Sequence, residues 1–465
     1  YTIDYNAAEI SFTPKQFITK DRRIVVEFQY SDKRYARPML TATIFHGDEE
    51  NHFYLNVFSE HDAKNQPLQQ EISDADRKLL SLAGDDPVGA ARSGITIGDF
   101  EFNRVMYELK DSLGFDSVLV YSVDSSRARA TAVFSLVGKG RGDYTEDGFT
   151  PFGKKYKWIS PSVQGADTLH YGEYDPLYVL YPPSQQQMIS GGFRHQLFPN
   201  FSLSMEGAVT HKDKNSFSRI DNSDDIGSAM RTHIAYDDRT QAKKLALTGE
   251  VIYEYVNRRF TMVERFREVE FARNWNLPQS LTRYDQHWLR VIPGIKIRDV
   301  GNVNLGADIL QVEGLQMGRK YSGSADLQKK DNWAVRGNAS ILNVSGASLS
   351  NFIRHKSYIS KTIGIYSAVF NDEHEWNRKY SFTGDSLLNE AYRFYDWQGS
   401  IGTTDTVKKA LRVHYRQRFE QRSDSLTIVP ASYAEQYGLT SRIQWSDGNH
   451  LGVNVANRRL NIIRT

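Results

Sequence analysis

Side chains of alternating character recur along most of this chain, and this alternation limits the fold more than any other feature. In KLALTGEVIYEYV (244–256), Leu247 and Tyr255 fall on one side of the period, whereas Glu250 and Glu254 fall on the other. Successive side chains of a β-strand point to opposite faces of the pleated backbone. The segment therefore predicts a strand with one apolar and one charged face, about twice as long as an average strand.

Strand-like segments of this kind pair across short polar turns. MLTATIFHG and HFYLNVFSEHD flank Asp48–Asn51, and SVLVYSVD and ARATAVFSLVG flank Ser125–Arg127. Further pairs flank residues 198–200, 239–243, 300–302, 329–332 and 404–409. Long connections separate the pairs, at 64–116, 141–184, 258–284 and 372–390. Short turns that alternate with long loops are typical of an up-and-down membrane β-barrel.

We therefore predict an all-β fold, a large antiparallel up-and-down transmembrane β-barrel over residues 36–465 with about 18 or more strands. Most strands reach about ten to thirteen residues, as a tilted strand needs to cross an apolar band about 25 Å tall. Soluble propellers and sandwiches have strands of about five to six residues. Residues 1–35 predict a small N-terminal β unit that leads into the barrel, with a third strand at 22–32.

Composition agrees with this fold and excludes several function classes. Mean hydropathy is −0.55, and no run of about 18 apolar residues predicts a transmembrane helix. A membrane β-barrel is polar on average because only every second residue faces lipid. The 58 Lys and Arg residues balance 56 Asp and Glu residues, which argues against a nucleic-acid partner. The absence of cysteine excludes disulfides, thiol catalysis and Cys-ligated zinc.

The charged sides of the strands predict the lining of a water-filled interior, because an unpaired charge is costly to remove from water. The residues that we assign to this lumen are Glu250, Glu254, Arg336, Arg412, Arg416 and Arg418. Aromatic residues on the apolar sides suit lipid-facing girdles at the membrane interfaces. The residues that we assign there are Tyr253, Tyr255, Trp333, Tyr415 and Trp445. An ordinary aromatic core, with the charged faces turned to solvent as in a sandwich, is the alternative.

One long connection contains a helical pattern. In SDADRKLLSLAG (73–84), Ser73 is a candidate N-cap, acidic residues occupy the first turn, and a leucine cluster precedes Gly84. We expect a surface helix that lies over a loop.

The N-terminal sequence resembles a known family. YTIDYNAAEISFTPKQFITKDRRIVVEFQYSDKRY, followed by SEHDAKNQP and GKGRGDY, is similar to a group of large, poorly characterised outer-membrane β-barrel proteins of Bacteroidota. The resemblance is closest over residues 1–66 and looser over 138–190. It implies the outer membrane of a Gram-negative bacterium, a periplasmic portion before Tyr1 and more barrel after Thr465. It transfers no catalytic residue.

Several motifs with chemical potential have plainer interpretations. GKGRGDY lacks the Walker spacing, which favours a flexible loop over a phosphate site, and His374-Glu375 is not followed by the second histidine of a zinc protease. DNSDD (221–225) and GDEEN (47–51) favour solvated acidic turns, with calcium as the alternative. Glu250 and Glu254 share one face of the strand, and paired carboxylates can catalyse glycoside hydrolysis. The arginine-rich neighbouring strands favour ion-pair ladders instead. We therefore expect no enzyme, no cofactor and no metal.

Two functions remain open. The first is an outer-membrane β-barrel that acts as conduit or scaffold within a multi-subunit cell-envelope complex, for secretion, barrel assembly or surface export. Its partners would be membrane lipid and other envelope proteins or lipoproteins. The second is a secreted soluble all-β surface protein that binds or hydrolyses glycans, with aromatics such as Trp158 and Trp376 as sugar platforms. Strand length favours the first.

Overall fold

The computed structural model is dominated by β-strands. It describes residues 2–4, 9–12, 26, 34–68, 70–86, 89–164, 167–238, 244–278, 284–330, 332–404, 407–424, 426–446 and 449–463. Two short α-helices and one 3-10 turn occur in this described part. Neither helix has the length or the apolar character that crossing a membrane requires.

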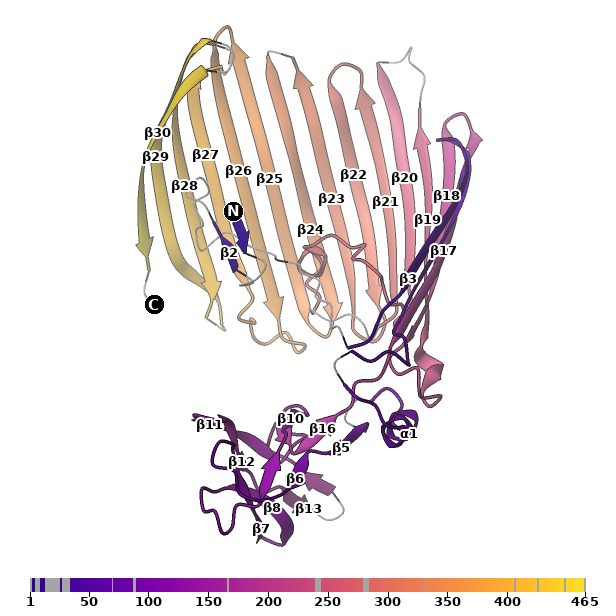
Figure 1. The fold of residues 1–465 in the computed structure, drawn as a ribbon. Helices are drawn as coiled ribbons and strands as arrows, with labels where there is room; N and C mark the ends of the chain where they lie inside the picture. The colour runs from indigo at the N-terminus through magenta and orange to yellow at the C-terminus, as the bar shows by residue number, and fades with distance from the viewer. Residues whose placement is uncertain are drawn as a thin grey trace.

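One antiparallel sheet of sixteen strands contains most of the chain (Figure 1). In sheet order its strands are β3 (Met39–Gly47), β4 (His52–His61), β17 (Gln185–Phe198), β18 (Phe201–Asp213), β19 (Ile226–Asp237), β20 (Leu245–Val256), β21 (Gln286–Ile297), β22 (Gly301–Val312), β23 (Gln316–Lys329), β24 (Trp333–Gly346), β25 (Leu349–Ile363), β26 (Tyr366–Tyr380), β27 (Tyr392–Thr403), β28 (Lys409–Ser423), β29 (Ile428–Ser446) and β30 (Asn449–Ile462). The expected all-β antiparallel meander is confirmed, with sixteen strands in this sheet where the sequence predicted about eighteen. Within the described ranges, no ladder joins β3 to β30.

The large sheet is strongly curved. Its edge strands come toward the viewer in Figure 1 while its middle strands recede, so the near face is concave. Short turns such as 199–200 and 364–365 lie at one end of the sheet, here called the tight-turn end. The long connections 62–184, 214–225 and 381–391 lie at the opposite end, together with the short turns 313–315 and 347–348. Residues 257–278, which follow β20 and include α2 (Phe271–Asn274), start at the opposite end and lie on the concave face. We call these residues the inner segment.

Residues 62–184, between β4 and β17, form a separate small β unit beyond the opposite end of the sheet (Figure 1). We call it the accessory unit. It contains α1 (Asp74–Leu82) and the strands β5 (Ala91–Ser93), β6 (Ile95–Ile97), β7 (Tyr107–Ser112), β8 (Phe115–Tyr121), β9 (Ala130–Ala132), β10 (Ser135–Leu136), β11 (Tyr144–Thr150), β12 (Gly153–Trp158), β13 (Ser162–Gln164), β14 (Asp167–Leu169), β15 (Tyr174–Asp175) and β16 (Leu177–Val179). None of these strands pairs with the large sheet.

The accessory unit corrects two predictions. Residues 64–116 and 141–184 are not plain long loops, and the segments around Ser125–Arg127 do not form a hairpin of the large sheet. Instead β8 pairs with β7, and β9 pairs with β6 and β7. These strands have two to seven residues. They are too short to build a tall wall, so their apolar side chains gather in a local core around Tyr107 and Leu119.

Helix α1 confirms the helix predicted at 73–84. The Ser73 hydroxyl accepts a hydrogen bond from the Asp76 backbone N–H, and the Asp76 carboxylate accepts one from the Ser73 N–H, a capping box that satisfies two free donors. Leu80 is completely buried on its inner side. Gly84 follows with a left-handed φ of +59°, which favours glycine at the end of a helix.

The prediction of a loop at 372–390 is wrong in its first half, because β26 continues through it. The charged residues suggested a loop, but both faces of the strand offer partners. Asp372 contacts His355 on the outer face, and Glu375 contacts Arg273 of the inner segment on the concave face.

Near the N-terminus, β1 (Thr2–Asp4) pairs with β2 (Glu9–Ser11). The third strand predicted at 22–32 lies outside the described residues, apart from Val26.

Candidate functional site

The outer face of the large sheet, opposite the inner segment, carries exposed apolar side chains on all sixteen strands. One from each strand, in sheet order, is Leu40, Phe53, Ile189, Met205, Ile234, Val251, Val291, Leu305, Tyr321, Ile341, Ile359, Phe370, Ile401, Val413, Leu439 and Val455. Their exposure runs from 37% for Phe370 to 70% for Ile401, and the ladder places neighbours such as Val251 and Val291 side by side. We call this face the apolar belt. Soluble monomers rarely expose so large a continuous apolar surface.

Aromatic side chains edge the apolar belt at the tight-turn end. Phe201 and Tyr236 contact each other there, with ring centroids 4.8 Å apart. Trp333 begins β24, Tyr366 begins β26, and Trp445 lies one residue before the end of β29. Two of the predicted girdle residues, Trp333 and Trp445, therefore lie at this edge.

The other three predicted girdle residues lie farther from the tight-turn end. Tyr253 and Tyr255 lie near the far end of β20, where the Tyr253 hydroxyl and Nδ1 of His287 are 2.9 Å apart. Tyr415 lies near the middle of β28 and packs against Tyr437, with ring centroids 4.8 Å apart. Trp333 and Trp445 thus lie at the tight-turn edge, Tyr253 and Tyr255 lie toward the opposite end, and Tyr415 lies at mid-height within the belt.

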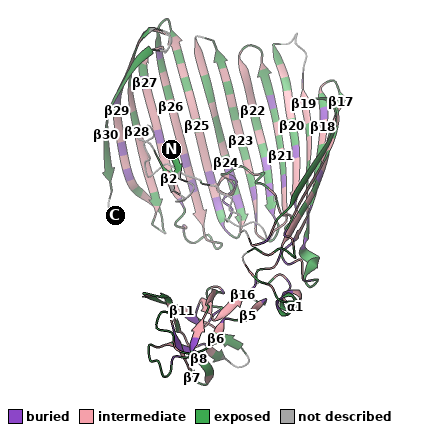
Figure 2. Ribbon diagram, in the orientation of Figure 1, coloured by how far each residue is buried: buried purple, intermediate pink, exposed green. Residues whose placement is uncertain are grey.

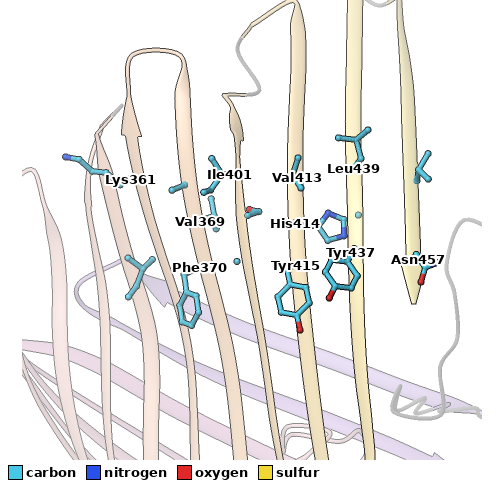
Figure 3. Close-up of a pocket in the computed structure, with 16 residues that line it drawn as sticks. Lys361, Val369, Phe370, Ile401, Val413, His414, Tyr415, Tyr437, Leu439 and Asn457 are labelled. Carbon is cyan, nitrogen blue, oxygen red and sulfur yellow. The ribbon is translucent and has the colours of Figure 1, made fainter. Parts of the chain in front are cut away.

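A hollow of about 810 Å³ lies in the apolar belt between β25 and β30. Figure 3 shows the aliphatic Val413 and Leu439 nearer the tight-turn end, and the rings of Phe370, Tyr415 and Tyr437 beyond them. Apolar side chains dominate the lining, so the hollow continues the belt and offers no chemistry of its own.

A polar cluster marks where the belt ends on β25 to β27. Nε2 of His355 lies 2.7 Å from Oδ2 of Asp372, and the Ser357 hydroxyl donates to the other oxygen of Asp372. The Tyr395 hydroxyl lies 3.4 Å from the same carboxylate. Because Ser357 donates to a carboxylate and not to an imidazole, the cluster lacks the geometry of an activated nucleophile. No local sequence pattern predicts this cluster, because its members come from three strands.

All six residues assigned to a lumen lie on the concave face, spread from β20 to β28. Glu254 pairs with Arg267 of the inner segment and, at 3.5 Å, with Arg231. The closest contacts of the other five are Glu250–His233 at 3.2 Å, Arg336–Gln328 at 2.7 Å, Arg412–Ser367 at 2.7 Å, Arg416–Asp396 at 2.5 Å and Arg418–Glu420 at 2.7 Å. They form ladders along the face and do not converge on one site. The assignment of this face to a water-filled lumen stays a prediction.

The inner segment packs aromatic residues against the concave face. Trp275 directly follows α2 and is completely buried, with Leu310 and Leu342 in the same cluster. Gly318 permits this approach, because a Cβ there would come within 2.9 Å of the Trp275 ring. Figure 2 shows buried residues of the sheet near the lower ends of its middle strands, beside this segment. The inner segment therefore fills part of the concavity with a true core.

Arg273 of α2 ties the inner segment to the sheet. Its guanidinium donates to the Glu375 carboxylate and, at 3.0 Å, to the Tyr392 hydroxyl, which itself donates to Glu375 at 2.6 Å. Glu375 is only 6% exposed. Burial opposes the charge on Arg273, but Tyr392 and Glu375 outweigh it and hold the Arg273 pKa above its ordinary value. The anchor is thus ionic and largely dry.

Arg267 forms a second anchor in a more apolar setting. Its guanidinium carbon lies 4.5 Å from the ring centre of Phe271 and 4.9 Å from that of Trp288, and it pairs with Glu254. Burial lowers the pKa of Arg267. Its Nε and Nη2 find no hydrogen-bond acceptor in the part of the chain that is described. A cavity of about 790 Å³ lies beside it, between the inner segment and the sheet.

The two aromatics considered as sugar platforms already contact protein groups. Trp158 packs edge-on against Phe115 in the accessory unit, with ring centroids 5.8 Å apart. Trp376 lies on β26, and the guanidinium carbons of Arg378 and Arg393 lie 4.2 and 5.0 Å from its ring centre. Both rings are therefore committed to internal contacts.

Comparison with known proteins gives a short match. Residues 1–32 match a family described as a domain of unknown function (DUF8818). No curated protein matches the chain. Because the match covers only the N-terminal β unit, function has to be argued from the geometry of the sheet.

Proposed function

We propose that this chain is an outer-membrane β-barrel protein of a Gram-negative bacterium, and that it acts as conduit or scaffold within a multi-subunit cell-envelope complex. The observation that carries the proposal is the apolar belt, present on every strand of a sixteen-stranded antiparallel sheet. Hydrocarbon is the surrounding that suits such a face, because no second layer of the described chain covers it. The resemblance of the N-terminal sequence to Bacteroidota outer-membrane proteins supports the same location.

Strand length fits this proposal, and closure of the sheet belongs to it. Strand β20 has 12 residues, which extend about 40 Å and, at a tilt of about 40°, still span about 30 Å of height. That exceeds the apolar band of about 25 Å in an outer membrane. Closure of the edges β3 and β30 is part of the proposal, because hydrocarbon leaves the backbone groups of an open edge unpaired.

The orientation follows from the connections. Barrels of this class place short turns in the periplasm and long connections outside the cell. The tight-turn end would then face the periplasm, and the accessory unit would lie on the outer side, where it offers a surface to other envelope proteins. The expected partners are membrane lipid and envelope proteins or lipoproteins. The proposed role as conduit or scaffold includes no catalysed reaction.

The inner segment supports a conduit that is closed at rest. It holds its place through two half-buried arginines, Arg267 on Glu254 and Arg273 on Glu375. Ion-pair ladders on the remaining concave face would line the water-filled path. A scaffold without conduction would use the same sheet with the inner segment permanently fixed.

Membrane partition is the direct test of this function. We expect the protein in the detergent extract of outer membranes, with heat-modifiable migration on gels, because a closed barrel resists detergent until it is heated. Quantitative recovery in the soluble fraction without detergent would reject the proposal and favour the secreted glycan-binding alternative.

Conductance separates the conduit from the scaffold. We expect low conductance for the unaltered protein in a planar bilayer and larger openings for the double variant Glu254→Gln/Glu375→Gln, which weakens both anchors. The matched control is Glu250→Gln, a concave-face carboxylate whose ion-pair partner among the described residues is His233 at 3.2 Å. Equal, negligible conductance in all three proteins would leave the scaffold.

A further inference from the structure

Three segments that are distant in sequence meet beside the start of β19. They are the turn after α1 (83–86), the loop after β18 (214–218) and the 3-10 turn η1 (Asn222–Asp224). Asn215 fastens two of them, because its side-chain amide donates to the Gly84 carbonyl at 2.6 Å. The junction therefore joins the accessory unit to a loop of the large sheet.

Three carboxylates converge at this junction. Asp85, Asp224 and Asp225 each place one oxygen within 4.8 Å of the other two. Two oxygens that both bind Ca²⁺ at about 2.4 Å lie at most about 4.8 Å apart, so this spacing suits a shared ion. Like charges at this separation repel unless a cation lies among them.

Asp225 provides an independent observation that points to a cation. It is 4% exposed, and its Oδ2 makes no hydrogen bond to any residue in the described ranges. It approaches Nε2 of His211 only at 3.8 Å, beyond hydrogen-bond range. A buried carboxylate of this kind is costly without a positive partner.

Lys214 neutralises part of the cluster from one side. Its Nζ lies 3.0 Å from Oδ2 of Asp85. Three carboxylates less one ammonium leave the cluster with a net negative charge. The lysine and a metal can share Asp85, because a carboxylate has two oxygens and about four acceptor positions.

We propose that Asp85, Asp224 and Asp225 bind one calcium ion, which fastens the accessory unit to the large sheet. Ca²⁺ accepts six to eight oxygen ligands in flexible geometry, whereas Mg²⁺ demands a near-ideal octahedron that irregular turns do not supply. The acidic turn at 221–225 predicts a solvated loop when it is considered alone. Asp85, brought from 139 positions earlier than Asp224, supplies the third ligand.

Calcium titration of the full chain tests the proposal. The protein is kept in whichever buffer or detergent holds it soluble, stripped with a chelator, and titrated with CaCl₂ by calorimetry. We expect one ion per chain, at least about tenfold tighter than Mg²⁺, and at least about tenfold weaker binding in Asp224→Asn and in Asp225→Asn. The matched control is Asp221→Asn, which removes a charge from the same turn outside the cluster and keeps the left-handed φ of +70° that Asn tolerates.

Two results would overturn the calcium site. One is the absence of saturable binding up to about 10 mM Ca²⁺, above the range of weak extracellular sites. The other is equal binding by Asp224→Asn, Asp221→Asn and the unaltered protein. Asp224 is exposed, so its variant decides the question even if the buried Asp225→Asn does not fold. Calcium should also slow proteolysis between the accessory unit and the sheet, except in Asp224→Asn.

Discussion

The accessory unit and the large sheet use the same alternation of side chains but put the apolar side in opposite surroundings. In the accessory unit, Leu119 is completely buried and Tyr107 is 1% exposed in a local core. In the large sheet, Leu305 is 62% exposed on the outer face. Strands of two to seven residues close around their own core, whereas strands of nine residues or more form the large sheet. Alternation therefore predicts a strand, and strand length distinguishes strands whose apolar side is buried in a small core from strands whose apolar side is exposed on the large sheet.

The concave face of the large sheet differs from both. The inner segment around Trp275 packs against it and fills part of the concavity. Its buried charges need partners from that segment, whereas the accessory core is almost free of charge. The molecule thus places charged and apolar side chains in three different environments: a largely dry ionic contact, a small apolar core and an exposed apolar belt.

The largest expected effect is at the dry ionic contact. Arg273→Met leaves the buried Glu375 carboxylate without its cation, and removal of one partner from such a pair costs about 3–5 kcal/mol. We expect the inner segment to detach while the large sheet persists, since the sheet ladders do not depend on it. Hydrogen exchange should show fast exchange confined to residues 257–278 and their contacts.

The matched control is Lys356→Met on the same face. Lys356 pairs with Glu373 at 3.4 Å, but the lysine side chain is 68% exposed, and exposed pairs contribute about 0–1 kcal/mol. Equal exchange rates in the two variants would show that the Arg273 contact does not hold the inner segment.

The second effect is on the small apolar core. Leu119→Ala removes packing from a completely buried site, which costs about 2–5 kcal/mol. We expect the accessory unit to unfold at lower temperature while strands β20 to β28 keep their exchange protection. Leu136→Ala, at a residue 63% exposed in the same unit, is the control and should change stability by less than about 0.5 kcal/mol. Simultaneous loss of the large sheet would show that the two regions fold as one.

These expectations show what the sequence could and could not predict. The period in 244–256 specified a long strand correctly, because alternation is a local property of the chain. The hairpin around Ser125–Arg127 was misplaced, because a short strand has the same period and only its partner shows where it belongs. The charges of β26 suggested a loop, since their partners His355 and Arg273 come from elsewhere in the chain.

The candidate site divides in the same way. The faces of Glu254 and Arg416 follow from strand parity, and the structure places both on the concave face. Their partners do not follow from parity: Glu254 meets Arg267 of a segment predicted only as a loop. The proximity of Asp85 to Asp225 could not be predicted from local sequence either, because the turn after α1 and the turn at 221–225 meet only in the folded chain.

The third effect compares two leucines of equal exposure. Leu305 on the apolar belt is 62% exposed and Leu136 in the accessory unit is 63% exposed. If hydrocarbon surrounds the belt, Leu305→Arg costs about 2–4 kcal/mol for folding into lipid vesicles. Leu136→Arg stays in water and should cost less than about 0.5 kcal/mol. Denaturant titration in vesicles measures the change in the free energy of unfolding for both variants. Equal, small changes would show that water and not hydrocarbon surrounds the apolar belt.

The smallest effect concerns the point where the chain leaves the sheet for the accessory unit. Asp62 accepts from Nε of Arg37 at 2.7 Å, and from the Ser184 backbone N–H at 2.8 Å and hydroxyl at 3.0 Å. Burial alone would raise the Asp62 pKa, but the Arg37 and Ser184 contacts outweigh it and hold the pKa below its ordinary value. The folded state therefore favours the ionised form, so the stabilisation is complete above about pH 3.9 and is lost as pH falls through the folded pKa.

Asp62→Asn should remove that stabilisation and cost about 1–2 kcal/mol at neutral pH. The difference from the unaltered protein should shrink as the pH falls from about 4 through the folded pKa, because Asp62 then becomes protonated and is neutral like asparagine. Urea unfolding followed at several pH values measures it. Asp99→Asn is the control: its carboxylate lies 2.6 Å from Arg129 but is 98% exposed, so solvent screens the pair. A pH-independent cost at Asp62 would assign the effect to shape and not to charge.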